Sequence, residues 1–277
     1  MNEAPKQLVP DWLKNLESCR IKNDGNPDDD WSPCLWYNRL NGERVPLVGK
    51  TELLVISGEE KARKSLLLSM FTASRFGFVG RSLTCGFELS MEEPVLYFDT
   101  EQPRRRVKKN RMRYQNLIGD PHGDDESFIQ YSLRGKTPHV MKECITHVIK
   151  EMVEKGTPPG VIVIDQIMDL SDTRDENDMK ASSELIDMVN LWSDMTGALM
   201  ALAIHTNRGG ERTRGKLGSL LDKKTDCSFL LNMDKETWTT TLTHSFSRES
   251  RMPQITFDQS YEGLPRFLDE RGPKSFF

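Results

Sequence analysis

The stretch TELLVISGEEKARKSLLLSMFTASRFGF, from Thr51 to Phe78, decides the fold of this chain. It begins with the apolar run Leu53–Ile56, which is typical of a strand that is covered on both faces of a sheet. A short polar loop starts at Gly58, and the mostly apolar residues after it predict a helix that opens at Lys64 and Ser65. We therefore expect a buried strand, a tight loop and a helix in direct succession.

The loop is close to the phosphate-binding P-loop pattern, because a glycine is followed by five residues and then by lysine and serine. Backbone N–H groups in such a loop, together with the start of the helix, favour a polyphosphate. We expect Lys64 at the β and γ phosphates and the Ser65 hydroxyl on Mg²⁺. The candidate nucleotide-binding residues are Gly58, Glu59, Glu60, Lys61, Ala62, Arg63, Lys64, Ser65 and Leu66.

One position departs from this pattern, because Arg63 stands where the motif usually has its second glycine. A side chain there costs about 1–2 kcal/mol if the backbone must be left-handed, and it stands close to the expected path of the phosphates. The loop taken alone therefore leaves an alternative, in which this is an ordinary strand-to-helix turn with a solvated lysine.

Composition limits the classes of protein to which the chain can belong. Its 277 residues suit one large α/β domain, assigned to 47–277, after an N-terminal extension and hairpin over 1–46. The formal net charge of −4 means that nucleic-acid binding requires a local basic surface. The five cysteines form no C-x-x-C pair, which indicates a reducing cytoplasm. With no signal core and no long apolar run, we expect a soluble protein without membrane association.

Two later strands end in carboxylates. VLYFDTEQP predicts a strand that ends near Asp99 and Glu101, and VIVIDQ predicts one that ends at Asp165. Because parallel sheets carry their ligand chemistry at the carboxyl ends of the strands, we expect these acids near Lys64. Asp165 is then placed to hold Mg²⁺ through water, opposite Ser65. For Glu101, the alternative is an acid that only stabilises the start of the next helix.

A further strand, ALMALAIH from Ala198, leaves the predicted sheet through His205. A polar side chain at this position is a candidate contact of the γ-phosphate. The alternative is a hydrogen-bonded histidine of the core. The tail then contains DCSFLLNM, TWTTTLTHSF and PQITFD, three short runs that predict an antiparallel extension of the main sheet.

Basic residues gather in three places. The helix Arg104–Leu117 suits a nucleic-acid backbone, an acidic partner or only a solvated helix face. Arg248 and Arg251 follow a predicted strand, from which they are able to reach a neighbouring subunit's nucleotide. The Gly-rich segment 208–224 is expected to be a mobile loop that orders on an anionic polymer, or else a solvated loop, with phosphate contacts from Arg208, Arg212, Arg214 and Lys216.

Several of these segments occur together in the order found in RecA-like ATPases. They are GEEKARKS, VLYFDTEQP, VIVIDQIMDL, AIHTNRGG and SRESRMPQITFDQSYEGLPRF. From roughly Leu47 to Phe267, the chain resembles the DnaB-type helicase core and the RepA-like AAA family ATPases of plasmids, mobile elements and phages. The resemblance implies a RecA-like P-loop NTPase fold of the α/β class, with a mostly parallel central sheet flanked by helices and a C-terminal antiparallel extension.

The resemblance also implies roles for single residues. Lys64 and Ser65 correspond to the P-loop pair, and ATP with Mg²⁺ is the implied cofactor. Glu101 is similar to the base that orients the attacking water, Asp165 to the Walker B acid, and His205 to the sensor. The basic segment after His205 resembles the DNA-binding loop. The residues that resemble fingers acting in trans on the next subunit are Arg248 and Arg251.

The implied activity is ATP hydrolysis by a helicase-like or loader protein coupled to DNA, with single strands favoured. Relatives of this kind usually form rings, often hexamers, so the resemblance implies a homo-oligomer. Two alternatives stay open. One is a nucleotide-binding scaffold or adaptor with a degenerate P-loop that does not hydrolyse ATP. The other is an ATPase that acts on protein rather than on nucleic acid.

Overall fold

The computed structural model of this chain describes residues 31–76, 81–120, 126–173, 175, 177–207, 213 and 215–271. The elements from Pro33 onward belong to one compact unit, Pro33–Phe277, which is distinct from Met1–Ser32. The predicted N-terminal extension therefore lies mostly outside the described residues. Its hairpin belongs to the compact unit.

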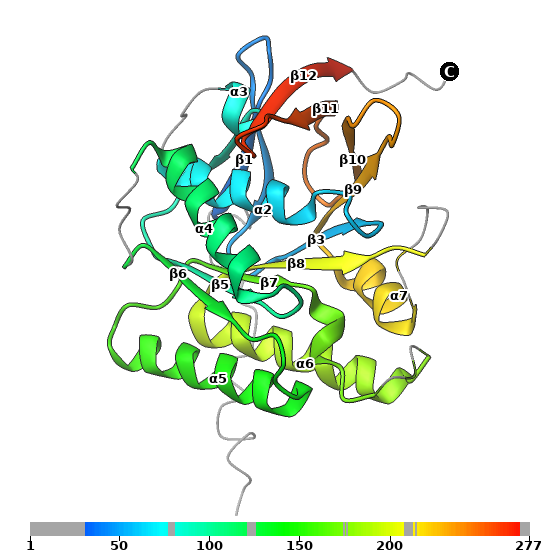
Figure 1. The fold of residues 1–277 in the computed structure, drawn as a ribbon. Coiled ribbons are helices and arrows are strands. Elements are labelled where there is room, and N and C mark those ends of the chain that lie inside the picture. Colours follow the sequence, from blue (N-terminus) through cyan, green and yellow to red (C-terminus); the bar gives the residue numbers. More distant parts are fainter. Residues whose placement is uncertain are drawn as a thin grey trace, which may run out of the picture. The chain divides into compact units, whose positions relative to one another are not determined.

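Twelve strands are found in the described residues, and they form two sheets. Their bounds are β1 Pro33–Asn38, β2 Arg44–Gly49, β3 Leu53–Gly58, β4 Phe87–Leu89, β5 Val95–Asp99, β6 Phe128–Ser132, β7 Val161–Asp165, β8 Leu199–His205, β9 Cys227–Met233, β10 Thr240–Ser247, β11 Gln254–Gln259 and β12 Pro265–Arg271. The larger sheet has the order β12-β11-β10-β9-β3-β8-β7-β5-β6 (Figure 1). The strands from β9 to β6 pair in parallel, and β10, β11 and β12 extend the sheet by antiparallel pairing.

Helices cover both faces of this sheet. The α-helices are α2 Lys64–Ala73, α3 Arg81–Thr84, α4 Arg104–Ile118, α5 Pro138–Glu154, α6 Met179–Thr196 and α7 Gly215–Lys224, and the short 3-10 helices are η3 Ser74–Phe76 and η4 Ile167–Leu170. Helices α2 and α4 pack on one face, and α5, α6 and α7 pack on the other (Figure 1). The sheet is thus the middle layer of three.

The alternation of side chains along each central strand explains this layering. In β3, Leu54 and Ile56 point into the core beneath α2, whereas Leu53 and Val55 point into the core beneath α5 and α6. Successive side chains of a strand lie on opposite faces, so a strand must be apolar at every position when both faces are covered. The continuous apolar runs of the sequence follow from this requirement.

The hairpin around Gly42 forms a second, smaller sheet. Strand β1 pairs with β2 and with β4, in antiparallel fashion on both sides. Its buried side chains join the core that α2 covers, where the Tyr37 and Phe87 rings meet edge to face with centroids 5.6 Å apart. The Phe87 ring also contacts Phe71 of α2 at 4.4 Å, so the small sheet is fixed to the helix that follows the P-loop.

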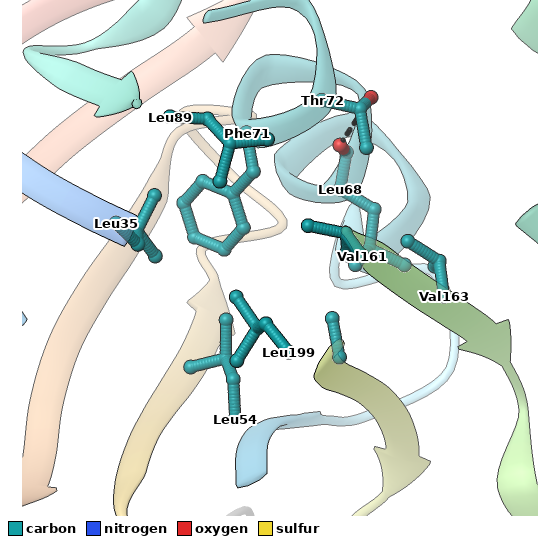
Figure 2. A pocket seen from close by; sticks show the side chains of 10 residues that line it. Leu35, Leu54, Leu68, Phe71, Thr72, Leu89, Val161, Val163 and Leu199 are labelled. Atoms are coloured by element: carbon teal, nitrogen blue, oxygen red, sulfur yellow. Dashed lines mark hydrogen bonds between the residues drawn. The ribbon is translucent and has the colours of Figure 1, made fainter. Parts of the chain in front are cut away.

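The packing of α2 on the sheet leaves a cavity of about 10 Å³ (Figure 2). Nine of its ten lining residues are apolar, and the hydroxyl of the tenth, Thr72, donates to the Leu68 carbonyl at 2.9 Å. A water molecule needs about 10–15 Å³ and two to four polar partners. This interior is therefore dry, and it holds α2 by apolar contact.

The predicted fold class is confirmed, with two corrections in detail. The antiparallel extension begins at β10, because β9 pairs in parallel with β3, and it has an additional strand, β12. The prediction of a mobile loop over 208–224 is wrong from Gly215 onward, where helix α7 begins. Leu217 and Leu221 of α7 are 2% and 0% exposed, and they pack into the core beneath the sheet. No helix in the described part of the chain is long and apolar enough to cross a membrane.

A substitution at Trp192 tests the packing between α5 and α6. Its ring is fully buried, and its indole N–H donates to the Thr146 hydroxyl of α5 at 3.0 Å. We expect Trp192→Ala to lower the free energy of unfolding by about 3–5 kcal/mol, because a large apolar volume is lost from a close-packed core. The neighbouring Leu191 is 52% exposed, so Leu191→Ala should change it by only about 0.5 kcal/mol. Urea denaturation of both variants measures the difference, and equal losses would contradict this packing.

Candidate active site

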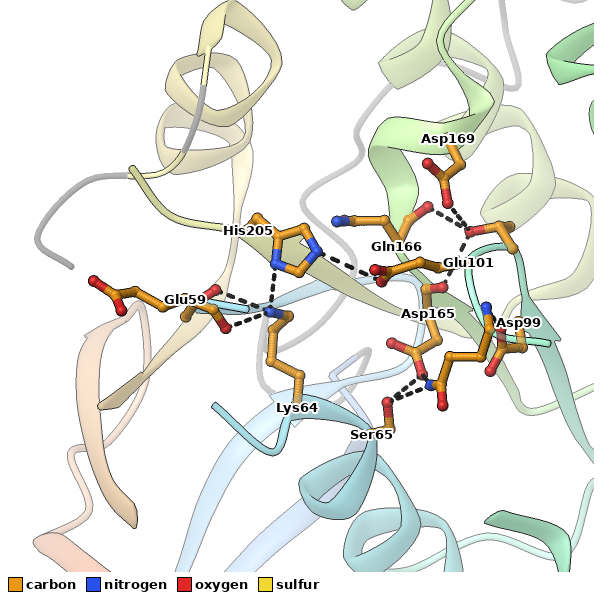
Figure 3. Close-up of polar contacts among 12 residues, drawn as sticks. Glu59, Lys64, Ser65, Asp99, Glu101, Asp165, Gln166, Asp169 and His205 are labelled. Carbon is orange, nitrogen blue, oxygen red and sulfur yellow. Dashed lines mark hydrogen bonds and ion pairs between the residues drawn. The ribbon is translucent and has the colours of Figure 1, made fainter. Parts of the chain in front are cut away.

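The predicted site residues meet at the carboxyl edge of the parallel strands (Figure 3). Strand β3 leads into the loop that carries Lys64, β5 leads to Glu101, β7 ends at Asp165 and β8 ends at His205. Because β7 and β8 lie between β3 and β5 in the sheet, these strand ends are neighbours. The sheet therefore collects residues that are up to 141 positions apart in the sequence.

Lys64 is held inside the loop by three contacts. Its ammonium donates to the carbonyls of Gly58 at 2.9 Å and Glu59 at 3.1 Å, and to Nδ1 of His205 at 2.8 Å. The residue is only 7% exposed, and burial lowers the pKa of the ammonium to about 8. At neutral pH the group is thus mostly charged, in a position where an anion would be the natural partner.

Arg63 adopts the left-handed backbone that the motif normally assigns to glycine, with φ of 69° and ψ of 29°. Its guanidinium points away from the contacts of Lys64. It donates to the carbonyl of Trp238 at 2.7 Å and lies 3.1 Å from the Thr240 hydroxyl, both next to the turn between β9 and β10. The side chain therefore does not obstruct the loop, and it fastens the P-loop to the antiparallel extension.

Ser65 and Asp165 form the centre of the site. The Ser65 hydroxyl donates to Oδ2 of Asp165 at 2.6 Å, and the buried Tyr97 hydroxyl donates to the same oxygen at 2.9 Å. Asp165 is 5% exposed, and burial raises the pKa of its carboxyl. The two hydroxyls offset part of that effect by hydrogen bonding to the charged form.

Glu101 and His205 continue this arrangement toward solvent. Oε2 of Glu101 lies 3.5 Å from Nε2 of His205, whose Nδ1 accepts from Lys64. These two contacts assign the ring proton to Nε2. The hydrogen bond from His205 lowers the pKa of Glu101, so the carboxyl is ionised at neutral pH. The Glu101 side chain is 52% exposed and accessible to water.

The donor set fits Mg²⁺ bound together with a phosphate. A hydroxyl and a carboxylate converge at the start of α2, and hard oxygen ligands of this kind suit the ion. The α2 N-terminus has no side-chain cap and no acid in its first turn, so its backbone N–H groups are available to bind an anion. Within the described residues, no group of three or more His, Cys, Asp or Glu could hold a metal ion. A metal ion would thus need phosphate oxygens and water to complete its ligands.

Comparison with known proteins identifies the family. The model of the AAA domain family matches residues 43–211, which include the P-loop and the strand ends with Glu101, Asp165 and His205. The chain belongs to this family of P-loop ATPases. A search of curated proteins found no match. The predicted resemblance to RecA-like AAA family ATPases is confirmed, and a P-loop ATPase domain of this kind generally binds ATP with Mg²⁺.

The sequence did not indicate Gln102 as a site residue of this AAA domain. Its Nε2 donates to the Ser65 hydroxyl at 3.0 Å and lies 3.4 Å from Oδ2 of Asp165. Its Oε1 lies 3.5 Å from the Asn110 amide of α4. The one available signal was its position directly after Glu101, at the carboxyl end of β5. Gln102 thus braces the two candidate metal ligands and connects them to α4.

Thr100 was not indicated by the sequence, whereas Asp99 was among the strand-end acids expected near Lys64, and both residues support the site at the end of β5. The Thr100 hydroxyl lies within 3.1 Å of the carbonyls of Asp165 and Gln166 and 3.0 Å from Oδ2 of Asp169. It therefore holds the ends of β5 and β7 together. Asp99 accepts from the Gln102 N–H at 2.7 Å, and burial raises its pKa to about 7.

The other predicted residues lie apart from this cluster. Strand β10 runs from Thr240, near the P-loop edge, to Ser247 at the opposite edge, and Arg248 and Arg251 follow that far end. Arg248 is paired with Asp226 at 2.8 Å. Both arginines are exposed and remote from Lys64 of the same chain. Of the predicted DNA contacts, Lys216 is exposed on α7, and Arg208, Arg212 and Arg214 lie outside the described residues.

Arg63 allows a test of the strained loop. Arg63→Ala and Arg63→Gly both remove the contacts with Trp238 and Thr240, but only glycine also relieves the left-handed backbone. We expect the alanine variant to be less stable than the glycine variant by about 1 kcal/mol. Urea unfolding gives the comparison. Equal stability of the two variants would mean that the loop is not strained at this position.

Gln102 gives a second test. We expect Gln102→Ala to raise the Mg²⁺ concentration needed for half-maximal binding of a fluorescent ATP analogue by about 10-fold or more, because residues that orient metal ligands have effects of this size. Binding without Mg²⁺ should be unchanged. Gln115→Ala, at a half-buried glutamine further along α4, is the matched control. An unchanged Mg²⁺ dependence in Gln102→Ala would remove Gln102 from this role.

Proposed function

We propose that this AAA domain hydrolyses ATP bound with Mg²⁺ and that hydrolysis is coupled to DNA, as in a helicase-like or loader ATPase. The convergence of Lys64, Ser65, Glu101, Asp165 and His205 at one sheet edge carries the proposal. Phosphoryl transfer to water depends mainly on positioning and charge neutralisation, and this set contains a group for each task.

The P-loop residues would bind the phosphates. Lys64 would exchange its contacts with the Gly58 and Glu59 carbonyls for phosphate oxygens, and the backbone at the start of α2 would add N–H groups. Ser65 and Asp165 would hold Mg²⁺, which supplies positive charge to the phosphate oxygens. Gln102 and Tyr97 would keep the Asp165 carboxylate in place for this contact.

Glu101 would orient the attacking water. It is ionised, partly exposed and next to His205, so it is able to accept a hydrogen bond from water at the edge of the site. His205 contacts both Glu101 and Lys64 and would therefore respond when the phosphate partner of Lys64 changes. This contact supports the assignment of His205 as a sensor.

The charge of Glu101 can be removed at nearly constant shape. We expect Glu101→Gln to lower ATP turnover by about 100-fold or more, because general-base and water-orienting groups contribute about 10²–10⁴-fold. The affinity for ATP with Mg²⁺ should stay within a few-fold. Phosphate release and binding of a fluorescent ATP analogue measure the two effects.

A second carboxylate provides the control for this experiment. Glu143 lies 3.3 Å from His139 in an exposed pair on α5, so Glu143→Gln disturbs a similar pair away from the site. Its turnover should equal that of the unmodified protein. Undiminished turnover in Glu101→Gln would remove Glu101 from its role and would leave the ATP-binding proposal intact.

The full active site would include a neighbouring subunit. Arg248 and Arg251 lie at the far edge of the sheet, so they are able to act only on the nucleotide of another copy, as in a homo-oligomeric ring. An arginine supplied in trans is worth about 10³–10⁵ in rate. Measurement of ATP turnover against protein concentration, with and without single-stranded DNA, tests assembly and DNA coupling together. Turnover per chain that is independent of concentration and of DNA would contradict both.

The alternative is a scaffold that binds nucleotide without hydrolysing it. It was suggested by the degenerate P-loop, but the anchored guanidinium of Arg63 weakens that argument, because the side chain is directed to Trp238 rather than toward Lys64. Binding of ATP without any turnover, at high protein concentration and with DNA present, would favour the scaffold.

A further inference from the structure

Helix α4 presents an unusual concentration of positive charge next to the active site. Five of its first six residues are exposed cations, namely Arg104, Arg105, Arg106, Lys108 and Lys109, and we call them the α4 basic surface. Within the described residues, none of the five forms an ion pair with a carboxylate. The roles proposed above for the P-loop and strand-end residues do not use this surface.

The later cations of the same helix have structural tasks. Arg111 donates to the Phe128 carbonyl, and Arg113 donates to the Gly263 carbonyl at 3.0 Å. The buried side of α4, which includes Tyr114 and Leu117, packs in the core that α2 covers. The fold thus accounts for the second half of the helix, and the charges of the first half need another explanation.

The α4 basic surface destabilises the start of the helix on which it lies. The start of a helix carries partial positive charge and favours acids, yet the first turn of α4 contains three arginines and no acid. Arg104 with Lys108, and Arg105 with Lys109, are like charges four residues apart, which repel each other on one helix face. The N-cap residue, Pro103, supplies no side-chain hydrogen bond. A polyanion at this end of the helix would relieve all of these effects together.

The α4 basic surface is also connected to the nucleotide site. Asn110, on the buried side of α4, contacts Gln102 at 3.5 Å, and Gln102 contacts Ser65 at 3.0 Å. The helix starts three residues after Glu101 and two after Gln102, at the same edge of the sheet. A ligand that moves or orders the start of α4 would therefore act on the residues that hold the metal ion.

We infer that the α4 basic surface binds the phosphate backbone of a single-stranded nucleic acid and passes this binding to the active site through Asn110 and Gln102. The inference rests on the proposed coupling to DNA and adds a second contact, at other residues than the predicted contacts Arg208, Arg212, Arg214 and Lys216 of the segment 208–224. The five cations lie within about two helical turns, and the residues of α4 among them include no exposed aromatic side chain. Such a surface is suited to bind phosphates of a nucleic-acid backbone and not to stack on bases.

A charge variant of α4 tests the inference. Arg105→Gln, Lys108→Gln and Lys109→Gln are combined in the full-length protein, since glutamine keeps helix propensity. Lys150→Gln, Lys155→Gln and Lys180→Gln, combined on the opposite layer, are the control with the same change in charge. Binding of a fluorescent single-stranded oligothymidylate is measured over a range of salt concentrations. The thermal midpoint of the α4 variant should not fall, because unfavourable charges are removed from the helix start.

We expect the α4 variant to bind the oligothymidylate more weakly at low salt and to lose about 0.7 from the salt slope for each phosphate contact removed. Its ATP turnover without DNA should be unchanged, and its stimulation by DNA should decrease. The control should behave as the unmodified protein. Binding by the α4 variant equal to that of the control overturns the inference and leaves the proposed function standing.

Two other outcomes separate the remaining explanations. If the unmodified protein fails to bind at low salt, the proposed coupling to DNA fails, and the inference fails with it. If the α4 variant binds DNA normally but sediments as a smaller species, the basic surface is a contact between copies of the chain, which also overturns the inference.

Discussion

The hydrogen bond from the Ser65 hydroxyl to the Asp165 carboxylate is the contact on which the site depends. It joins residues that are 100 positions apart, at the start of α2 and at the end of β7. Strand β8 lies between β3 and β7 in the sheet, so only the correct strand order brings the two groups together. Tyr97 and Gln102 direct their polar groups to the same carboxylate oxygen, and a buried acid without such donors would be costly. The strand order of the fold therefore determines which polar groups meet in the site.

Much of this arrangement could be predicted from the sequence because its signals are local. The apolar runs before Gly58 and Asp165 require burial on both faces, and parallel strands bring their carboxyl ends to one edge. Lys64, Glu101, Asp165 and His205 follow from those two facts. Their proximity is therefore a property of the topology.

Other features depend on contacts that a sequence does not display. Gln102 carries no motif, and its role as a brace appears only when Ser65 and Asp165 are adjacent. The glycines and lysines of α7 made the segment look like a loop. Leu217 and Leu221 nevertheless have helical spacing, and both are buried in the core. The direction of the Arg63 side chain was equally unpredictable, because its partners beside the β9–β10 turn are 175 and 177 residues away.

The placement of β3 has a consequence for how the chain is made. This strand leaves the ribosome before both of its neighbours in the sheet, because β8 and β9 follow it about 150 and 170 residues later. The P-loop residue Arg63 likewise makes its contact with Trp238 only after the β9–β10 turn has been synthesised. During synthesis the apolar strand β3 must therefore stay without its final partners until β8 and β9 have been made. Such long-range pairing slows folding and exposes aggregation-prone surface, so nascent chains of this protein need protection until nearly the whole domain has been made.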